Sequence, residues 1–140
     1  KKKITPPNLN NSNKTTEVPT RVEQEWFRRA QLRRWDNKCA LTNCSILNVL
    51  EASHIVPRAK CSDNEKLDDA NGILFSANIH NLFDNNLISF DDRGAIIISK
   101  AISNEDKKIL GLSNNMKIRV YKTMLKYLKR HRKQFYNANK

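Results

Sequence analysis

Two long segments of the chain place apolar residues at helical spacing, one near each end. The first begins at Thr20, because Thr20-Arg-Val-Glu23 has the pattern of a capping box, in which the threonine and glutamate side chains bond the first backbone amides of a helix. It should end near Trp35. The second helix is predicted from about Asn115 to Tyr136. Its apolar face consists of Ile118, Tyr121, Leu125 and Leu128.

Shorter elements lie between these helices. Apolar residues bounded by turn residues predict extended segments over residues 39–42, 46–52, 73–75, 87–90 and 95–99. The last two segments flank a turn that ends at Gly94, which is typical of a hairpin. Ser76 can cap a helix over residues 77–84, and Ser103 can cap a brief helix that ends at Gly111. Residues 58–70 are polar and predict a loop, so the expected fold class is α+β.

Composition divides the chain into a polar arm and one small domain. Residues 1–19 are rich in Lys, Asn, Thr and Pro and predict a flexible linker ahead of a domain over residues 20–140. The net charge is +12, and residues 107–140 carry eleven Lys and Arg without any Asp or Glu. This excess favours a polyanionic partner such as a nucleic acid, and a solvated basic face is the plain alternative.

The number of cysteines and the length of the apolar runs indicate in which cellular compartment the protein lies. Cys39, Cys44 and Cys61 are odd in number, and no secretory signal pattern precedes the folded part, which predicts reduced thiols in a cytoplasmic protein. A single close pair does not complete a four-cysteine zinc site. No apolar run approaches the roughly 18 residues that span a bilayer, so we expect no membrane partner. The chain begins with lysine rather than methionine, which indicates a fragment of a longer protein.

The stretch Glu51-Ala-Ser-His54-Ile-Val-Pro57 places an imidazole at the end of a predicted strand. An unperturbed imidazole titrates near pH ~6.5 and can accept a proton from water. Because Pro57 discourages further pairing, His54 should face a cleft, although a satisfied structural histidine is the alternative. Asn71 follows seventeen residues later and precedes a glycine. Its default role is a local turn, and the functional alternative is an amide that bridges the long loop and orients His54.

His80 and Asp84 are one helical turn apart on the predicted helix 77–84 and project from one face. An imidazole with a carboxylate suits a divalent ion such as Mg²⁺, Mn²⁺ or Zn²⁺. Glu51 is a candidate third ligand from the preceding strand. A surface pair of His80 and Asp84 without a metal is the alternative.

Taken together, these residues resemble the HNH endonucleases, whose active site is a ββα-metal fold. The resemblance covers about residues 39–99 and rests on CALTNC, LEASHIVP, NGILFSANIHNLFD and DDRGAIIIS. It looks most like the bacterial restriction-type branch, with its His-Ile-x-Pro signature and a Phe-Asp after the last histidine. RVEQEWFRRAQLRRW is similar to the helix that often leads into this core. The resemblance implies a ββα-metal core with flanking helices, a trailing hairpin and a basic C-terminal helix at about residues 115–136.

The resemblance also implies an activity, which is metal-dependent hydrolysis of DNA in restriction or another defence against foreign DNA. Its catalytic residues would be His54 as the water-activating base, Asn71 in a mainly structural role, and His80 as the metal-binding residue. Asp84 would be a further ligand or a group that supports one, and Glu51 remains the candidate third ligand. We expect one divalent ion, with Mg²⁺ or Mn²⁺ first and Zn²⁺ or Ni²⁺ as other candidates. HNH relatives commonly leave a 5′ phosphate, and we expect that product here.

One residue departs from the family pattern. Many relatives carry Asp or His directly before the catalytic histidine as a metal ligand, whereas Ser53 stands there in this chain. A serine hydroxyl is a weak ligand, so either Glu51, Asp84 or water completes the coordination, or the metal affinity is low. Ser53 therefore favours one alternative, a DNA-binding module that no longer cleaves. A nuclease toxin acting on RNA or on a competitor's chromosome is the other alternative.

Basic residues supply contacts to phosphates that do not depend on nucleotide sequence. Two candidates follow His54 closely, and three lie on the predicted C-terminal helix: Arg58, Lys60, Lys126, Lys129 and Arg130. The expected partner is DNA. A homodimer and a target-recognition domain N-terminal to this fragment are further candidate partners.

Overall fold

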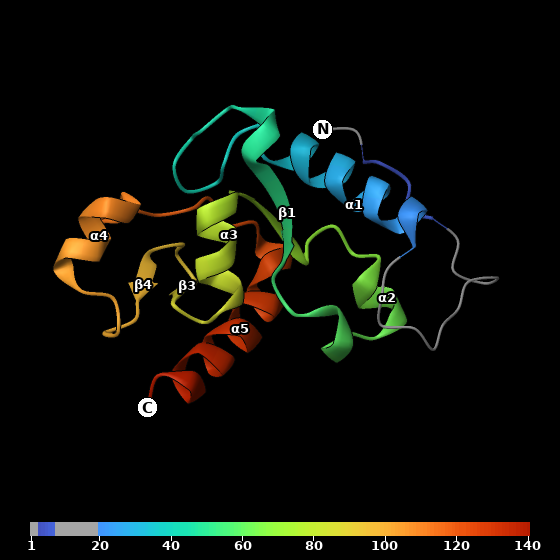
Figure 1. Cartoon of the computed structure of the whole chain (residues 1–140). Helices are drawn as coiled ribbons and strands as arrows, with labels where there is room; N and C mark the ends of the chain where they lie inside the picture. The colour runs from blue at the N-terminus through green and yellow to red at the C-terminus, as the bar shows by residue number, and fades with distance from the viewer. Residues whose placement is uncertain (1–2, 8–19) are drawn as a thin grey trace.

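The computed structural model describes residues 3–7 and 20–140, and it has a mixed α+β architecture (Figure 1). Most of the predicted flexible arm over residues 1–19 lies outside the described residues, and residues 3–7 form neither helix nor strand. The elements follow one another as α1 (Arg21–Arg34), β1 (Leu50–His54), α2 (Asp63–Lys66), β2 (Gly72–Ser76), α3 (Ala77–Asp84), β3 (Ile88–Phe90), β4 (Ile96–Ile98), α4 (Asn104–Leu110) and α5 (Leu125–Ala138). Three 3₁₀ turns, Leu47–Val49, Arg58–Lys60 and Lys122–Met124, join them.

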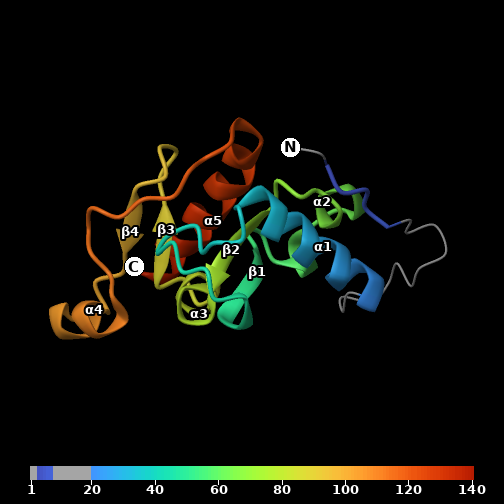
Figure 2. The ribbon, with the colours of Figure 1, turned by 90° about the horizontal axis from the view of Figure 1, so that it is seen from above.

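The centre of the described structure consists of β1, β2 and α3. The two strands pair antiparallel, from Leu50 opposite Ser76 to His54 opposite Gly72, and α3 begins directly after β2. Helices α1 and α2 lie on one side of this unit, and β3, β4 and α4 lie on the other (Figures 1 and 2). The order strand, strand, helix is therefore present, as the sequence predicts.

Side chains on β1 alternate between two helices because successive residues of a strand point to opposite faces. Glu51 and Ser53 contact side chains of α3, whereas His54 contacts Phe27 of α1. Among the residues that the structure describes, no strand pairs with the second edge of β1. Side chains from both faces can therefore reach a ligand that lies along this open edge.

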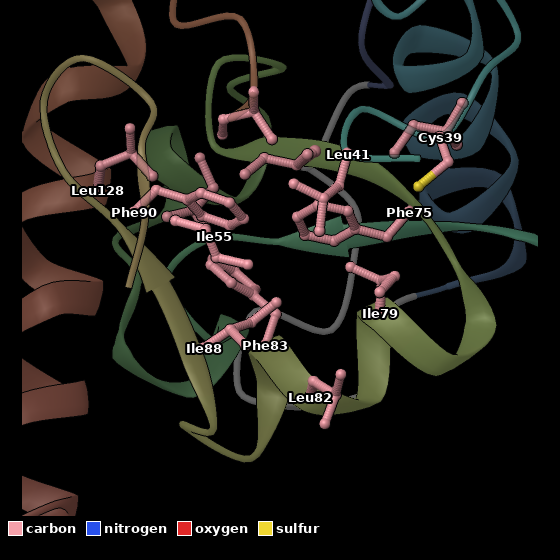
Figure 3. Close-up of a cluster of buried hydrophobic side chains, with 14 of the residues drawn as sticks. Cys39, Leu41, Ile55, Phe75, Ile79, Leu82, Phe83, Ile88, Phe90 and Leu128 are labelled. Carbon is pink, nitrogen blue, oxygen red and sulfur yellow. The ribbon is translucent and has the colours of Figure 1, made fainter. Parts of the chain in front are cut away.

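The main core packs β2, α3 and the hairpin β3–β4 against α5. Phe75, Phe83 and Phe90 are fully buried, and their ring centroids are 5.3 to 6.0 Å apart (Figure 3). Tyr127 and Leu128 of α5 are also fully buried. The C-terminal helix is therefore part of the core as well as a carrier of positive charge.

Several predicted elements are confirmed. Helix α3 has the predicted bounds, the hairpin β3–β4 forms, and α4 follows Ser103 and ends at Gly111 with a left-handed φ of 73°. Helix α1 begins after Thr20, whose hydroxyl accepts from the amide of Glu23 at 3.1 Å. The predicted capping box is only half formed, because the Glu23 carboxylate pairs with Arg58 instead of returning to the start of the helix.

The prediction of one helix from Asn115 to Tyr136 is wrong over nearly its first half. Residues 116–118 bind the hairpin instead: the amide of Ile96 donates to Met116 O at 3.1 Å, and the amide of Ile118 donates to Gly94 O at 2.9 Å. Pairing with an available strand edge thus outweighs the helical spacing of the apolar residues. Helix α5 begins at Leu125.

Two further predictions are corrected. Residues 39–43 form a turn rather than an extended segment, with Asn43 at φ 65°, and β1 begins at Leu50 rather than Ile46. The predicted loop 58–70 contains α2, which is held by a capping box between Ser62 and Glu65. This four-residue helix is too short to produce a recognisable apolar period in the sequence.

Candidate functional site

His54 is the last residue of β1 and lines a cavity of about 340 Å³. One wall of the cavity comes from α1, and the other comes from β1 and the residues after it. The lining residues are Glu23, Gln24, Phe27, Arg28, Glu51, Ala52, His54, Arg58 and Lys66. The His54 ring is stacked on Phe27, with 3.8 Å between ring centroids and 2° between ring planes. His54 therefore borders a cleft, and one face of its ring is covered.

The environment of His54 favours the neutral imidazole. Burial, followed by the positive charge of Arg58 and then His80, lowers the pKa of His54 to about 4. Its Nε2 atom is buried and has no hydrogen-bond partner among the residues that the structure describes. At neutral pH this ring is unprotonated and has a nitrogen free to accept a proton.

Asn71 bridges the loop that follows His54. Its Oδ1 accepts from the amide of Val56 at 2.9 Å, and its Nδ2 lies 3.3 Å from the sulfur of Cys61. The amide of Ile55 donates to the Asn71 carbonyl at 3.3 Å. Asn71 is fully buried, so these bonds fix the two residues after His54 without a direct contact to the imidazole.

Two carboxylates lie near the Nε2 atom of His80 on α3. Asp84 Oδ2 is 3.2 Å away and Glu51 Oε1 is 3.6 Å away. Ser53 is fully buried and donates to Asp84 Oδ1 at 3.4 Å, so the serine holds the carboxylate that the sequence assigns to a metal. Burial raises the pKa of Asp84; the nearby Glu51 acts in the same direction, whereas His80 and Ser53 oppose it.

The donor set around His80, an imidazole and two carboxylates, suits a divalent cation in its chemistry. Ligands about 2.1 Å from one ion, at octahedral or tetrahedral angles, lie roughly 3.0 to 3.4 Å apart. The two distances at His80 are close to this range. Within residues 3–7 and 20–140, however, no three His, Cys, Asp or Glu side chains converge as a complete metal site. The three residues fit a partial ligand set that water or substrate oxygens would complete.

The predicted nucleic-acid contacts occupy different environments. Arg58 is partly buried and forms an ion pair with Glu23 at 2.7 Å, whereas Arg130 pairs at the surface with Glu65 at 2.7 Å. Lys60 donates to Gln134 at 3.2 Å. Lys126 and Lys129 are exposed on α5, and Lys126 borders a second cavity of about 920 Å³ between α1 and residues 119–126, away from His54.

The structure adds residues that sequence reasoning missed. Phe27 covers His54, and Arg28 donates to the carbonyls of Leu50 at 2.6 Å and Leu47 at 3.2 Å, next to the start of β1. The signal for Phe27 was weak, because an aromatic residue on the apolar face of a helix is usually a core residue. Glu23 fits the capping-box pattern, so the sequence gives no sign that its carboxylate pairs with Arg58 instead.

Comparison with known protein families gives one match. Residues 39–91 match a family model described as HNH endonuclease, and this match supports a place in the HNH superfamily. It covers the strands β1 and β2 and the helix α3, together with His54, Asn71, His80 and Asp84. No curated protein matches the chain. In the part of the chain that the structure describes, no helix has both the length and the apolar character needed to cross a membrane.

Proposed function

We propose that this protein is a divalent-metal-dependent endonuclease that hydrolyses phosphodiester bonds of DNA, with β1, β2 and α3 as a ββα-metal core. One observation carries the proposal: a single cavity at the open edge of β1 is lined by His54 and by Glu51, whose carboxylate contacts His80. A base and a candidate ligand set are thus adjacent although they lie on opposite faces of the strand. The HNH family match covers both histidines.

In this proposal each residue has a defined role. His54 takes a proton from the attacking water, while stacking on Phe27 keeps its ring plane fixed. Asn71 holds the loop after His54 in place. His80, Asp84 and Glu51 would hold the ion. When bound, a divalent ion supplies polarisation of the phosphate and stabilises charge on the leaving 3′ oxygen.

The cleavage test uses supercoiled plasmid with Mg²⁺, Mn²⁺, Zn²⁺ or Ni²⁺, alone or with EDTA. We expect nicking or linearisation that EDTA abolishes, with 5′ phosphate ends. His54→Ala and His80→Ala should each lower the rate by about a hundredfold or more. His131→Gln is a matched control, because His131 is a buried histidine outside this cavity. A plasmid that stays intact with every metal would refute the proposed activity.

A second candidate function is DNA binding without cleavage, and Ser53 is the observation that favours it. The hydroxyl at this position bonds Asp84 instead of offering a charged ligand. Retarded migration of a DNA duplex without any cut product would support this function. Adding single-stranded DNA and RNA as substrates separates both candidates from a nuclease toxin that acts on RNA.

The biological setting that we propose is restriction or another defence against foreign DNA. This part of the proposal rests on the resemblance of residues 39–99 to restriction-type HNH proteins. A homodimer, a preceding target-recognition domain and a cytoplasmic location stay predictions from the sequence.

A further inference from the structure

We propose that α1, which lies outside the segment matched by the HNH family, forms a wall of the active site, and that its Phe27 is a positioning residue for His54. The inference rests on the proposed nuclease function and extends it to residues 21–34. Figure 1 shows α1 lying beside β1.

The stacking geometry restricts rotation of the His54 ring. The ring of Phe27 is parallel to the imidazole within 2°, and the 3.8 Å between centroids leaves little lateral offset. Turning the imidazole about its Cβ–Cγ bond would drive a ring edge into the face of Phe27. The contact therefore fixes the plane in which Nδ1 and Nε2 lie. Phe27 also offers a π face to the imidazolium that forms when His54 accepts a proton.

Close approach of α1 to the strands depends on Gly72, which lies opposite His54 in the β1–β2 register. A Cβ atom at this position would lie 2.7 Å from Phe27 Cζ and 2.3 Å from Gln31 Nε2. The glycine thus leaves room for Phe27 to reach the end of β1. The same helix face is held by Gln31, which donates to the carbonyl of Asp69 at 2.8 Å.

Glu23 provides a second connection between α1 and the site. Its side chain is 5% exposed and pairs at 2.7 Å with Arg58, which is 12% exposed and lies in the turn after Pro57. A buried carboxylate is tolerated when it is paired in this way. Glu23 and Arg58 line the same cavity as His54. The ion pair therefore keeps the guanidinium beside the cavity at a fixed position.

These contacts join α1 to both ends of β1. Arg28 binds the carbonyl of Leu50 at the start of the strand, and Phe27 stacks on His54 at its end. A helix that served only to cover apolar surface would not need these polar contacts. Phe27 and Arg28, which contact β1, both line the cavity, and so does Glu23.

The test compares plasmid cleavage by the whole chain and by Phe27→Leu, with Trp26→Leu as the matched control. Trp26 is a buried aromatic residue on the same helix, and its ring nitrogen donates to Ile4 O at 3.0 Å. We expect Phe27→Leu to lower kcat by about tenfold or more and to leave KM for DNA within about twofold. Trp26→Leu should leave kcat within about twofold of wild type. Thermal melting by circular dichroism checks that both variants fold.

Two additional measurements keep the inference falsifiable if Phe27→Leu does not fold. Glu23→Gln preserves the volume of the side chain and should lower kcat by about tenfold with little change in KM, because Arg58 loses its ionic partner. NMR spectra of the wild-type chain should show the carbon-bound ring protons of His54 shifted upfield by the Phe27 ring. These protons at their ordinary positions would overturn the stacking.

The outcomes separate the two proposals. Wild-type cleavage together with full cleavage by Phe27→Leu overturns the positioning role of Phe27, and full cleavage by Glu23→Gln overturns the contribution of the Glu23–Arg58 pair. Either result leaves the nuclease function intact. A wild-type chain that cleaves no nucleic acid overturns the nuclease function, and the positioning role with it. Loss of kcat in Phe27→Leu and Glu23→Gln but not in Trp26→Leu supports both.

Discussion

His131 should make the stability of this protein depend on pH. The residue lies on α5, is 3% exposed, and stacks on Phe83 with 3.7 Å between ring centroids. Its Nε2 is 3.0 Å from the carbonyl oxygen of Phe83, which can only accept, so this nitrogen carries the proton. Its Nδ1 then accepts from the hydroxyl of Ser89 at 2.8 Å. Burial lowers the pKa of His131 to about 4.

The size of the effect follows from the difference between the folded and unfolded pKa. A fall from the ordinary 6.5 to about 4 corresponds to about 3 kcal/mol of stability. Because the folded pKa is depressed, this contribution is complete above about pH 6.5 and is lost as pH falls through about 4. His131→Gln cannot titrate, and its amide can still donate to Phe83 and accept from Ser89.

Urea unfolding of both proteins at intervals from pH 7 to pH 4 measures this contribution. We expect the wild-type chain to lose about 3 kcal/mol more than His131→Gln over this interval. The other titrating groups, including His54, are common to both proteins and cancel in the comparison. Parallel stability curves would show that His131 is not buried as a neutral ring.

Three further predictions concern the site. Asn71→Ala removes the acceptor for the amide of Val56 and should destabilise the fold by about 2 to 3 kcal/mol, measured as a lower urea midpoint; an unchanged midpoint would contradict the bridging role. Ser53→Asp places a second carboxylate against Asp84. The melting temperature of this variant should therefore fall in EDTA, because the two negative charges repel each other. Its affinity for Mn²⁺, measured by calorimetry, should rise about tenfold. Unaltered Mn²⁺ binding would place the ion elsewhere. Arg28→Ala removes two bonds to backbone carbonyls and should cost about 1 to 3 kcal/mol, against which Arg29→Ala, at an exposed position of the same helix, should be near neutral.

The elements that the sequence predicts well are those with local signals. Helix α3 has a buried stripe of Ile79, Leu82 and Phe83, and α4 has a serine cap and a terminal glycine. The predictions that fail depend on contacts between distant segments. Residues 116–118 are drawn into pairing with residues 94–96, which no local spacing indicates.

The candidate site shows the same division. His54, Asn71 and His80 are recognisable because their spacing follows a motif. Their surroundings were not predictable from that motif. Phe27 is twenty-seven residues before His54, and no periodicity links a helix residue to the end of a strand. The pairing of Glu23 with Arg58 was hidden for the same reason.

The segment that carries the HNH motif packs against α1 and α5. These contacts limit how the chemistry of the site can be transferred to another protein. An excised piece of residues 39–91 would bare the face of the His54 ring that Phe27 covers. It would also lack Tyr127 and Leu128, which are wholly inside the native core. A chimera that grafts this site onto another chain should therefore carry α1 and α5 together with residues 39–91, because both helices pack against the segment that holds the motif.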